Sequence, residues 1–192
     1  MKNPLDSVGF TVTLGIVFSI LVMVVIPGEG YNDPGMSRWL HIVSGIFWIG
    51  LLYYFNVVQI PALAVAGADP GGPGGAGITK YVAPRALLWF RWAAVATWFT
   101  GAWLLGPRFM PALTFQDGSQ VIGLGVWLGT FMLFNVWVLI WPNQKKVLGL
   151  VAATDAQKAR ARRTATLTSR LNFLLSFPML LCMGGSAHGL PF

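Results

Sequence analysis

Apolar residues fall in long, nearly continuous blocks along the chain, separated by short stretches rich in glycine, proline and charge. A helix of roughly 20 apolar residues crosses the hydrocarbon core of a bilayer, so each block predicts a membrane-spanning helix. Because the blocks are continuous rather than alternating, they favour a helical bundle over a β-barrel. We therefore expect an all-α integral membrane protein that forms a single domain over residues 1–192. Its five spans are expected at about residues 8–26, 38–61, 86–106, 119–141 and 170–188.

The ends of these helices carry local signals. Proline cannot continue a regular helix, so prolines that follow the first four blocks are expected to close those spans. These are Pro27, Pro61, Pro107 and Pro142. The fifth span differs, because Thr154 and Asp155 can cap a helix that runs through the preceding basic segment into the span.

Charge is distributed unevenly between the two ends of the predicted spans. The 13 Lys and Arg residues exceed the 6 Asp and Glu residues, which gives a net charge of +7. Ten of the basic residues fall in segments that five spans place on one side: Lys2, Lys80, Arg85, Lys145, Lys146, Lys158, Arg160, Arg162, Arg163 and Arg170. The other side carries Glu29, Asp33 and Asp117 with Arg38 and Arg108.

By the positive-inside rule the basic side is cytoplasmic, so the N-terminus is expected in the cytoplasm and the C-terminus in the periplasm. The expected location is the inner membrane of a bacterium. The charge reports topology, and it does not indicate a nucleic-acid partner.

Several kinds of chemistry are excluded by the residues present. The lone Cys182 cannot form an intrachain disulfide or a CxxCH motif for covalently attached haem. No predicted span contains a carboxylate, and no phosphate loop, nucleophile elbow or zinc-protease motif occurs. The remaining possibilities are redox or metal chemistry, or a role as an accessory subunit.

The two histidines of the chain are the first candidate site. His41 lies just inside the outer end of the second span, and His188 lies at the outer end of the fifth. Paired imidazoles hold b-type haem or a metal such as copper. Gly45 and Gly184, each one turn away, would leave room beside the two rings. The alternative is a pair of interfacial histidines bonded to water or lipid headgroups.

Polar residues near the cytoplasmic end of the bundle form the second candidate site. They come from four different spans: Asn56, Arg91, Asn135 and Asn172. Such residues usually face the bundle interior and bond to one another, so a structural hydrogen-bond layer is one interpretation. The other is a pocket for a planar anion or a haem propionate with Arg91 as counter-charge. Tyr53, Tyr54 and Gln59 could contribute to this pocket.

The segment RWLHIVSGIFWIGLLYYFNVVQIPA at 38–62 resembles the opening signature of the urate oxidase N-terminal family, the membrane domain of membrane-bound urate hydroxylases. SRLNFLLSFPMLLCMGGSAH at 169–188, Arg91-Trp92 and Trp141-Pro142-Asn143-Gln144 are also similar. The resemblance implies that His41 and His188 match the family's histidine positions, and that Asn56, Arg91 and Asn172 match its polar ones. Long members continue into a cytochrome c domain. Since this sequence has no CxxCH, we expect a short form that lacks it.

Three functions remain open. The first is a protein that binds haem b or a metal through His41 and His188 and transfers electrons to or from a separate cytochrome. The second is a non-catalytic subunit of a larger respiratory or energy-converting membrane complex. The third is urate hydroxylation with an external electron acceptor.

Overall fold

The computed structural model describes residues 3–26, 30–116 and 118–191, and every regular element in these ranges is a helix. The all-α expectation is therefore confirmed for this part of the chain. Four residues used in the sequence analysis, Lys2, Pro27, Glu29 and Asp117, lie outside it. The chain divides into two compact units, Met1–Gly35 and Met36–Phe192.

The first unit contains η1 (Pro4–Asp6), α1 (Val8–Val25) and the first residues of α2 (Asp33–Tyr53). None of the side chains of α1 is buried. The second unit continues through α2 and holds the remaining elements: η2 (Tyr54–Gln59), α3 (Ile60–Ala68), η3 (Ile78–Val82), α4 (Ala83–Leu105), η4 (Gly106–Arg108), α5 (Phe109–Leu113), α6 (Gln120–Phe134), η5 (Asn135–Ile140), α7 (Trp141–Val147) and α8 (Asp155–His188).

Four helical stretches within the described ranges are long and apolar enough to cross a membrane. They are Val8–Val25, Asp33–Ala68, Gln120–Val147 and Asp155–His188. The sequence predicts five spans, and the block at 86–106 is the one that falls short, although it forms the 23-residue helix α4. Arg91 and four tryptophans lower the apolarity of α4.

Two prolines do not end helices as predicted. The segments η2, η3 and η5 are π-helical, and each stands two residues before a proline, namely Pro61, Pro84 and Pro142. A π-helical turn shifts each hydrogen bond to the carbonyl five residues back, as from Ile60 N–H to Phe55 O. The widened turn accommodates a proline ring that would clash in a regular α-helix. The prediction that Pro61 and Pro142 close their spans is therefore wrong, because the helices continue as α3 and α7.

The other predicted helix ends agree with the structure. α4 ends at Leu105, shortly before Pro107. At the start of α8, the Thr154 side chain accepts a hydrogen bond from Gln157 N, and the Gln157 side chain accepts one from Thr154 N. This capping box begins a single helix that runs from the basic segment to His188, as predicted.

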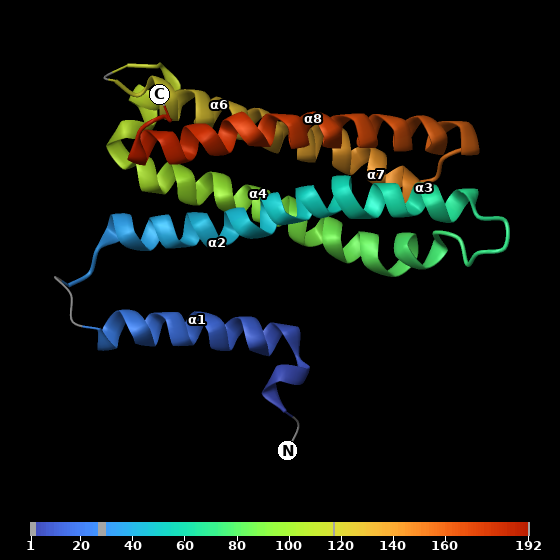
Figure 1. Ribbon diagram of the computed structural model, residues 1–192, viewed down its shortest axis with the longest axis horizontal. Coiled ribbons are helices and arrows are strands. Elements are labelled where there is room, and N and C mark those ends of the chain that lie inside the picture. The colour runs from blue at the N-terminus through green and yellow to red at the C-terminus, as the bar shows by residue number, and fades with distance from the viewer. Residues whose placement is uncertain (1–2, 27–29, 117, 192) are drawn as a thin grey trace. The chain divides into compact units, whose positions relative to one another are not determined.

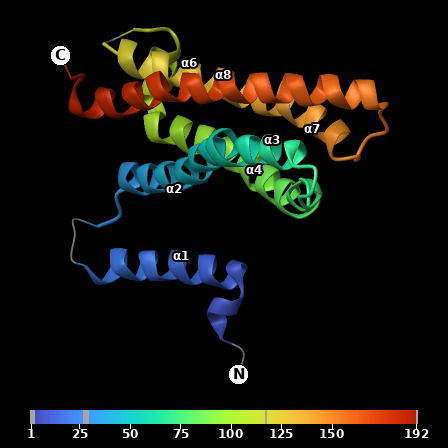
Figure 2. The ribbon, with the colours of Figure 1, turned by 45° about the vertical axis from the view of Figure 1, so that its right-hand side comes forward.

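The core of the second unit lies where α2, η2, α4, α6, η5 and α8 meet. Its buried residues are Trp48, Leu52, Phe55, Leu87, Phe90, Ala93, Ala94, Met132, Val136, Ile140 and Met179. Figures 1 and 2 show α6 and α8 side by side along most of their length. Gly125 permits this approach, because a Cβ atom there would lie 3.1 Å from Cys182 Cβ.

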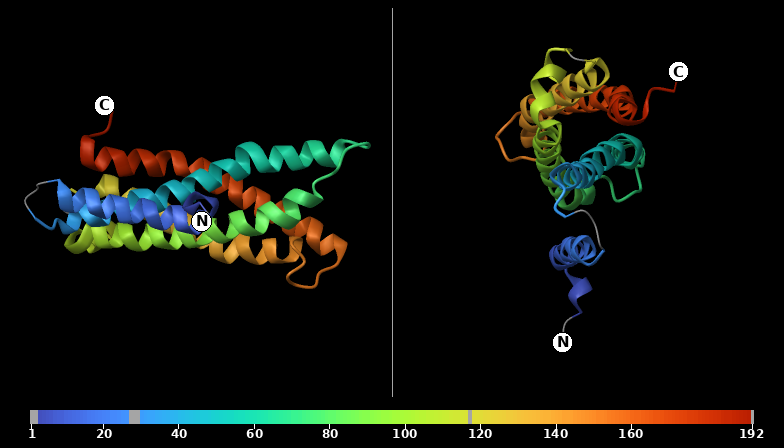
Figure 3. Two further views of the ribbon diagram at one scale, coloured as in Figure 1. Left: turned by 90° about the horizontal axis from the view of Figure 1, so that it is seen from below. Right: turned by 90° about the vertical axis from the view of Figure 1, so that its left-hand side faces the viewer.

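The ends of the second unit place the candidate sites. Figures 1 and 3 show the start of α2 and the end of α8 at one end of this bundle. The end of α3, the end of α7 and the start of α8 lie at the opposite end. The histidines therefore belong to one end of the bundle and most of the basic residues to the other.

Candidate functional site

His41 is held against α4 by a backbone hydrogen bond. Its Nδ1 lies 2.8 Å from the carbonyl oxygen of Thr97, four residues after Ala93 of the core. A carbonyl oxygen can only accept, so Nδ1 carries the proton and donates it. In the neutral ring Nε2 then keeps its lone pair. A hydrogen bond from Nδ1 to a backbone carbonyl is the arrangement that orients a histidine for ligation through Nε2.

Gly101 of α4 makes room for the imidazole. A Cβ atom at this position would lie 2.8 Å from His41 Cε1 and 3.0 Å from Nδ1. At Gly45 a Cβ atom would make only an ordinary contact of 3.8 Å with Thr97 Cγ2. The glycine that the ring requires is thus on the neighbouring helix rather than on the histidine's own.

His188 is in a different environment. It is the last residue of α8, its side chain is exposed, and no described contact joins it to His41. A Cβ atom at Gly184 would meet nothing within 4 Å, so this glycine faces open space. The two histidines share one end of the bundle.

The two histidines can be compared with the ligand needs of a metal ion and of haem. No group of three or more His, Cys, Asp or Glu residues in the described ranges could hold a metal ion. A haem iron receives its equatorial ligands from the porphyrin and needs one or two from the protein. Because Nδ1 is bonded to Thr97, His41 has Nε2 left for a ligand bond, and haem ligation by His41 stays a prediction.

Three of the four predicted polar residues make hydrogen bonds to α8 or within its contacts, in two separate pairs, Asn135 with Asn172 and Asn56 with Ser169. Asn135 Nδ2 donates to Asn172 Oδ1 at 2.7 Å, and Asn172 Nδ2 donates to the Met132 carbonyl at 2.9 Å. Asn56 Nδ2 donates to Ser169 Oγ at 2.9 Å and to the Leu52 carbonyl at 2.8 Å. Both pairs tie α8 to the other helices of the bundle.

Arg91 lies apart from these amides. Its guanidinium stacks over the Trp141 ring at 3.8 Å from the ring centroid. In this cation–π contact, the ring face of Trp141 on α7 stabilises the positive charge of Arg91 on α4. Tyr53 contacts α8 close to Asn172. Its hydroxyl accepts a hydrogen bond at 3.1 Å from Oγ of Ser176, which lies one turn after Asn172 on that helix.

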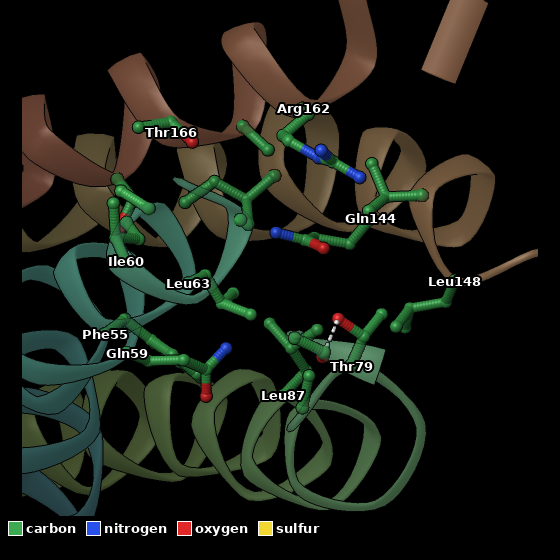
Figure 4. A pocket seen from close by; sticks show the side chains of 18 of the residues that line it. Phe55, Gln59, Ile60, Leu63, Thr79, Leu87, Gln144, Leu148, Arg162 and Thr166 are labelled. Carbon is green, nitrogen blue, oxygen red and sulfur yellow. Dashed lines mark hydrogen bonds between the residues drawn. The ribbon is translucent and has the colours of Figure 1, made fainter. Parts of the chain in front are cut away.

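A cavity of about 520 Å³ opens at the basic end of the bundle, between α3, η3, the start of α4, α7 and α8. Figure 4 shows Gln59, Gln144 and Arg162 around it, together with Thr79 and Thr166. Of these residues, only Gln59 is a predicted site residue. The others come from three elements, η3, α7 and α8, which no sequence pattern places side by side.

Sequence reasoning also misses Thr97, Thr100 and Gly101 as partners of His41. Thr97 acts through its backbone carbonyl, and Thr100 Oγ1 lies 3.5 Å from His41 Nδ1. In the sequence, the only sign of these partners is the spacing Thr97-x-x-Thr100-Gly101, and the sequence does not show which span packs against it.

Neither a search of curated proteins nor a search of solved structures gives a match. Residues 108–191 do match a protein family, described as urate oxidase N-terminal. The matched range contains Trp141-Pro142-Asn143-Gln144 and the segment 169–188, but not the second predicted span at 38–61. The predicted resemblance to the urate oxidase N-terminal family is therefore confirmed over residues 108–191.

Proposed function

We propose that this chain is an integral membrane redox protein of the urate hydroxylase type, which binds haem b through His41 and exchanges electrons with a separate cytochrome. The proposal places the chain in a bacterial inner membrane with its basic end in the cytoplasm. The observation that carries it is the 2.8 Å contact between His41 Nδ1 and the Thr97 carbonyl. This contact leaves Nε2 as the ligating atom.

When bound, the haem would supply one-electron transfer. The chain's own residues hold the ligand in place: the Thr97 carbonyl selects the tautomer, and Gly101 leaves space for the ring. Such outer contacts orient a ligating histidine and make it more basic. His188, the other histidine of the chain, ends α8 at the same end of the bundle and would be the second residue that holds the haem.

The absorption spectrum and iron content of the purified protein test this proposal. We expect a Soret band and about one haem per chain, loss of the band in His41→Ala, and an altered spectrum in His188→Ala. Ile42→Ala is the matched control, since Ile42 is exposed beside His41 and is expected to leave the spectrum unchanged. A haem-free protein that co-purifies with a larger respiratory complex would instead indicate an accessory subunit.

A second candidate function is urate hydroxylation with an external electron acceptor. The family match over residues 108–191 favours it. Urate-dependent reduction of added cytochrome c by the protein in lipid nanodiscs is the expected result. No urate-dependent reduction with either cytochrome c or ferricyanide would exclude this activity while leaving haem binding unaffected.

A further inference from the structure

Arg91 and Lys145 place two positive charges around one aromatic ring. The Arg91 guanidinium stacks on the Trp141 ring at 3.8 Å from its centroid, and Nζ of Lys145 lies 5.9 Å from the same centroid. Neither cation forms an ion pair in the described ranges, where the recorded pair joins Lys158 and Asp155. The surrounding helices α4, α6, η5 and α7 contain no Asp or Glu. Within the described part of the chain, the two charges therefore have no anionic partner.

The contact with Trp141 leaves the donors of Arg91 available. A guanidinium that packs on an indole face directs its N–H groups along its own plane and away from the ring. These N–H groups form a fork that matches two oxygens of a phosphate. Lys145 follows Trp141 by one helical turn near the end of α7 and adds a flexible donor beside the same ring. In membrane proteins, tryptophan is frequent at the level of the lipid headgroups, where phosphates lie.

An apolar groove lies next to these cations, between α4 on one side and α6 and η5 on the other. Its volume is about 480 Å³, and it is lined by Val95, Trp98, Phe99, Thr130, Leu133, Phe134 and Trp137. The polar groups of this lining are engaged or covered. Trp98 Nε1 donates to Thr130 Oγ1 at 2.8 Å, Thr130 Oγ1 donates to the Val126 carbonyl at 2.8 Å, and Trp137 Nε1 is buried. The groove therefore presents an aromatic and aliphatic surface, which suits a hydrocarbon chain.

The cations and the groove form one continuous seam. Three contacts follow one another along it: Arg91 with Trp141, Trp92 with Trp137, and Trp98 with Thr130. Residue numbers rise along α4 while they fall along the facing helix, so the groove leads away from the cations in one direction. From Arg91 to Phe99, α4 rises by about 12 Å, and one leaflet of the hydrocarbon core is roughly 15 Å thick. The seam therefore has the polarity and the length of one lipid molecule in its leaflet.

We propose that this seam binds an anionic phospholipid of the phosphatidylglycerol class, with its phosphate held by Arg91 and Lys145 and one acyl chain in the groove. A zwitterionic phospholipid carries a positive group beside its phosphate, which two unpaired cations disfavour. A soluble anion would leave the groove unused. The proposal rests on the membrane placement given under the proposed function, and it is independent of haem binding.

Native mass spectrometry of the full chain in detergent, titrated with single lipids, tests the proposal. We expect about one dioleoylphosphatidylglycerol per chain, bound at least tenfold more tightly than dioleoylphosphatidylcholine. Glycerol phosphate has the charge without the chains, and oleate has a chain with a carboxylate. Both are expected to bind at least tenfold more weakly than the phosphatidylglycerol. The proposal is overturned if phosphatidylcholine, glycerol phosphate or oleate binds as tightly, since these results would exclude the charge, the groove or the phospholipid headgroup as the basis of recognition.

Matched charge variants locate the headgroup. Arg91→Gln and Lys145→Gln are each expected to weaken phosphatidylglycerol binding at least fivefold. Arg85→Gln and Lys146→Gln remove the same charge from the same two helices, at residues that make no cation–π contact with Trp141 in the described ranges, and should leave binding unchanged. Circular dichroism checks the fold of each variant, and Lys145→Gln tests the site if Arg91→Gln does not fold. Equal weakening by Lys145→Gln and Lys146→Gln would refute the assignment.

A second pair of variants tests the groove. Val95→Trp places a larger ring in the groove and is expected to weaken binding at least fivefold. Val138→Trp makes the same change at an exposed residue of η5 that does not line the groove, and should leave binding unchanged. Unchanged binding in Val95→Trp would show that no acyl chain lies there and would overturn the proposal. Haem content, measured on the same samples, reports on the redox proposal separately, so either proposal can fail alone.

Discussion

Asn135 and Asn172 bond to each other across the contact between η5 and α8, with Nδ2 of Asn135 2.7 Å from Oδ1 of Asn172. Both side chains are buried, at 1% and 0% exposure. Such a pair fixes how two helices meet, because any other register would leave two amides without partners. The pair therefore sets the position of α8, and with it those of Arg162 and His188.

We predict that Asn135→Leu lowers the free energy of unfolding by about 1 kcal/mol, since it leaves Asn172 Oδ1 buried and unpaired. The double variant with Asn172→Leu removes both partners and is expected to lose less than the sum of the single variants. Thermal unfolding can be followed by thiol labelling, because Cys182 is buried and free. Additive losses would show that the two amides do not interact.

The sequence was sufficient to predict the helical bundle, because apolar blocks of about 20 residues have few other solutions. It also predicted the start of α8, where the signal from Thr154 to Gln157 is local. The continuation of helices through Pro61 and Pro142 was not predictable in the same way. It depends on π-helical turns, whose cost is offset by packing between helices that are distant in sequence.

The candidate sites, like the fold, were predictable only where the signal is local in the sequence. His41 stood out because histidine is rare in this chain, but its partner Thr97 is 56 residues away and acts through a main-chain atom. Because every residue has a backbone carbonyl, the residue type does not show which carbonyl accepts a hydrogen bond from a side chain. Likewise, Arg162 was identified only as one of many basic residues, and its place on the cavity depends on how α8 packs against α3 and α7.

Gly101→Ala is predicted to reduce haem content several-fold. The added Cβ would lie 2.8 Å from His41 Cε1, so the imidazole must move and lengthen its hydrogen bond to Thr97. Gly50→Ala is the control, because a Cβ at Gly50 meets nothing within 4 Å. The measurement is the ratio of Soret absorbance to protein. Equal haem content in the two variants would contradict the role of Gly101.

Thr154→Ala is predicted to destabilise the first turn of α8 by about 1 kcal/mol, since it removes the side-chain acceptor for Gln157 N. Hydrogen exchange at residues 155–160 should become faster, with little change near Asn172. Thr164→Ala, a substitution within the same helix away from its cap, is the control. If exchange in the first turn is unchanged, the capping box does not hold the start of α8.

Gly123 and Gly129 are buried glycines of α6 with different surroundings, and alanine is predicted to act in opposite directions at the two positions. A Cβ at Gly123 would collide with the backbone carbonyl oxygen of Ala112 in α5, which cannot move aside as a flexible side chain can. Gly123→Ala should therefore lower stability by about 1–3 kcal/mol. A Cβ at Gly129 would meet nothing within 4 Å, so Gly129→Ala should be neutral or stabilising by up to about 1 kcal/mol through its higher helix propensity.

Cys182 labelling during heating measures both variants under the same conditions. The difference in sign separates the close approach of α5 and α6 from a general intolerance of α6 to substitution. If both variants lose stability equally, the close contact between Gly123 and Ala112 does not determine the packing of α5. In that case the buried surface of Ile122 and Val126, together with the hydrogen bond from Trp127 Nε1 to the Leu113 carbonyl, holds α5 in place.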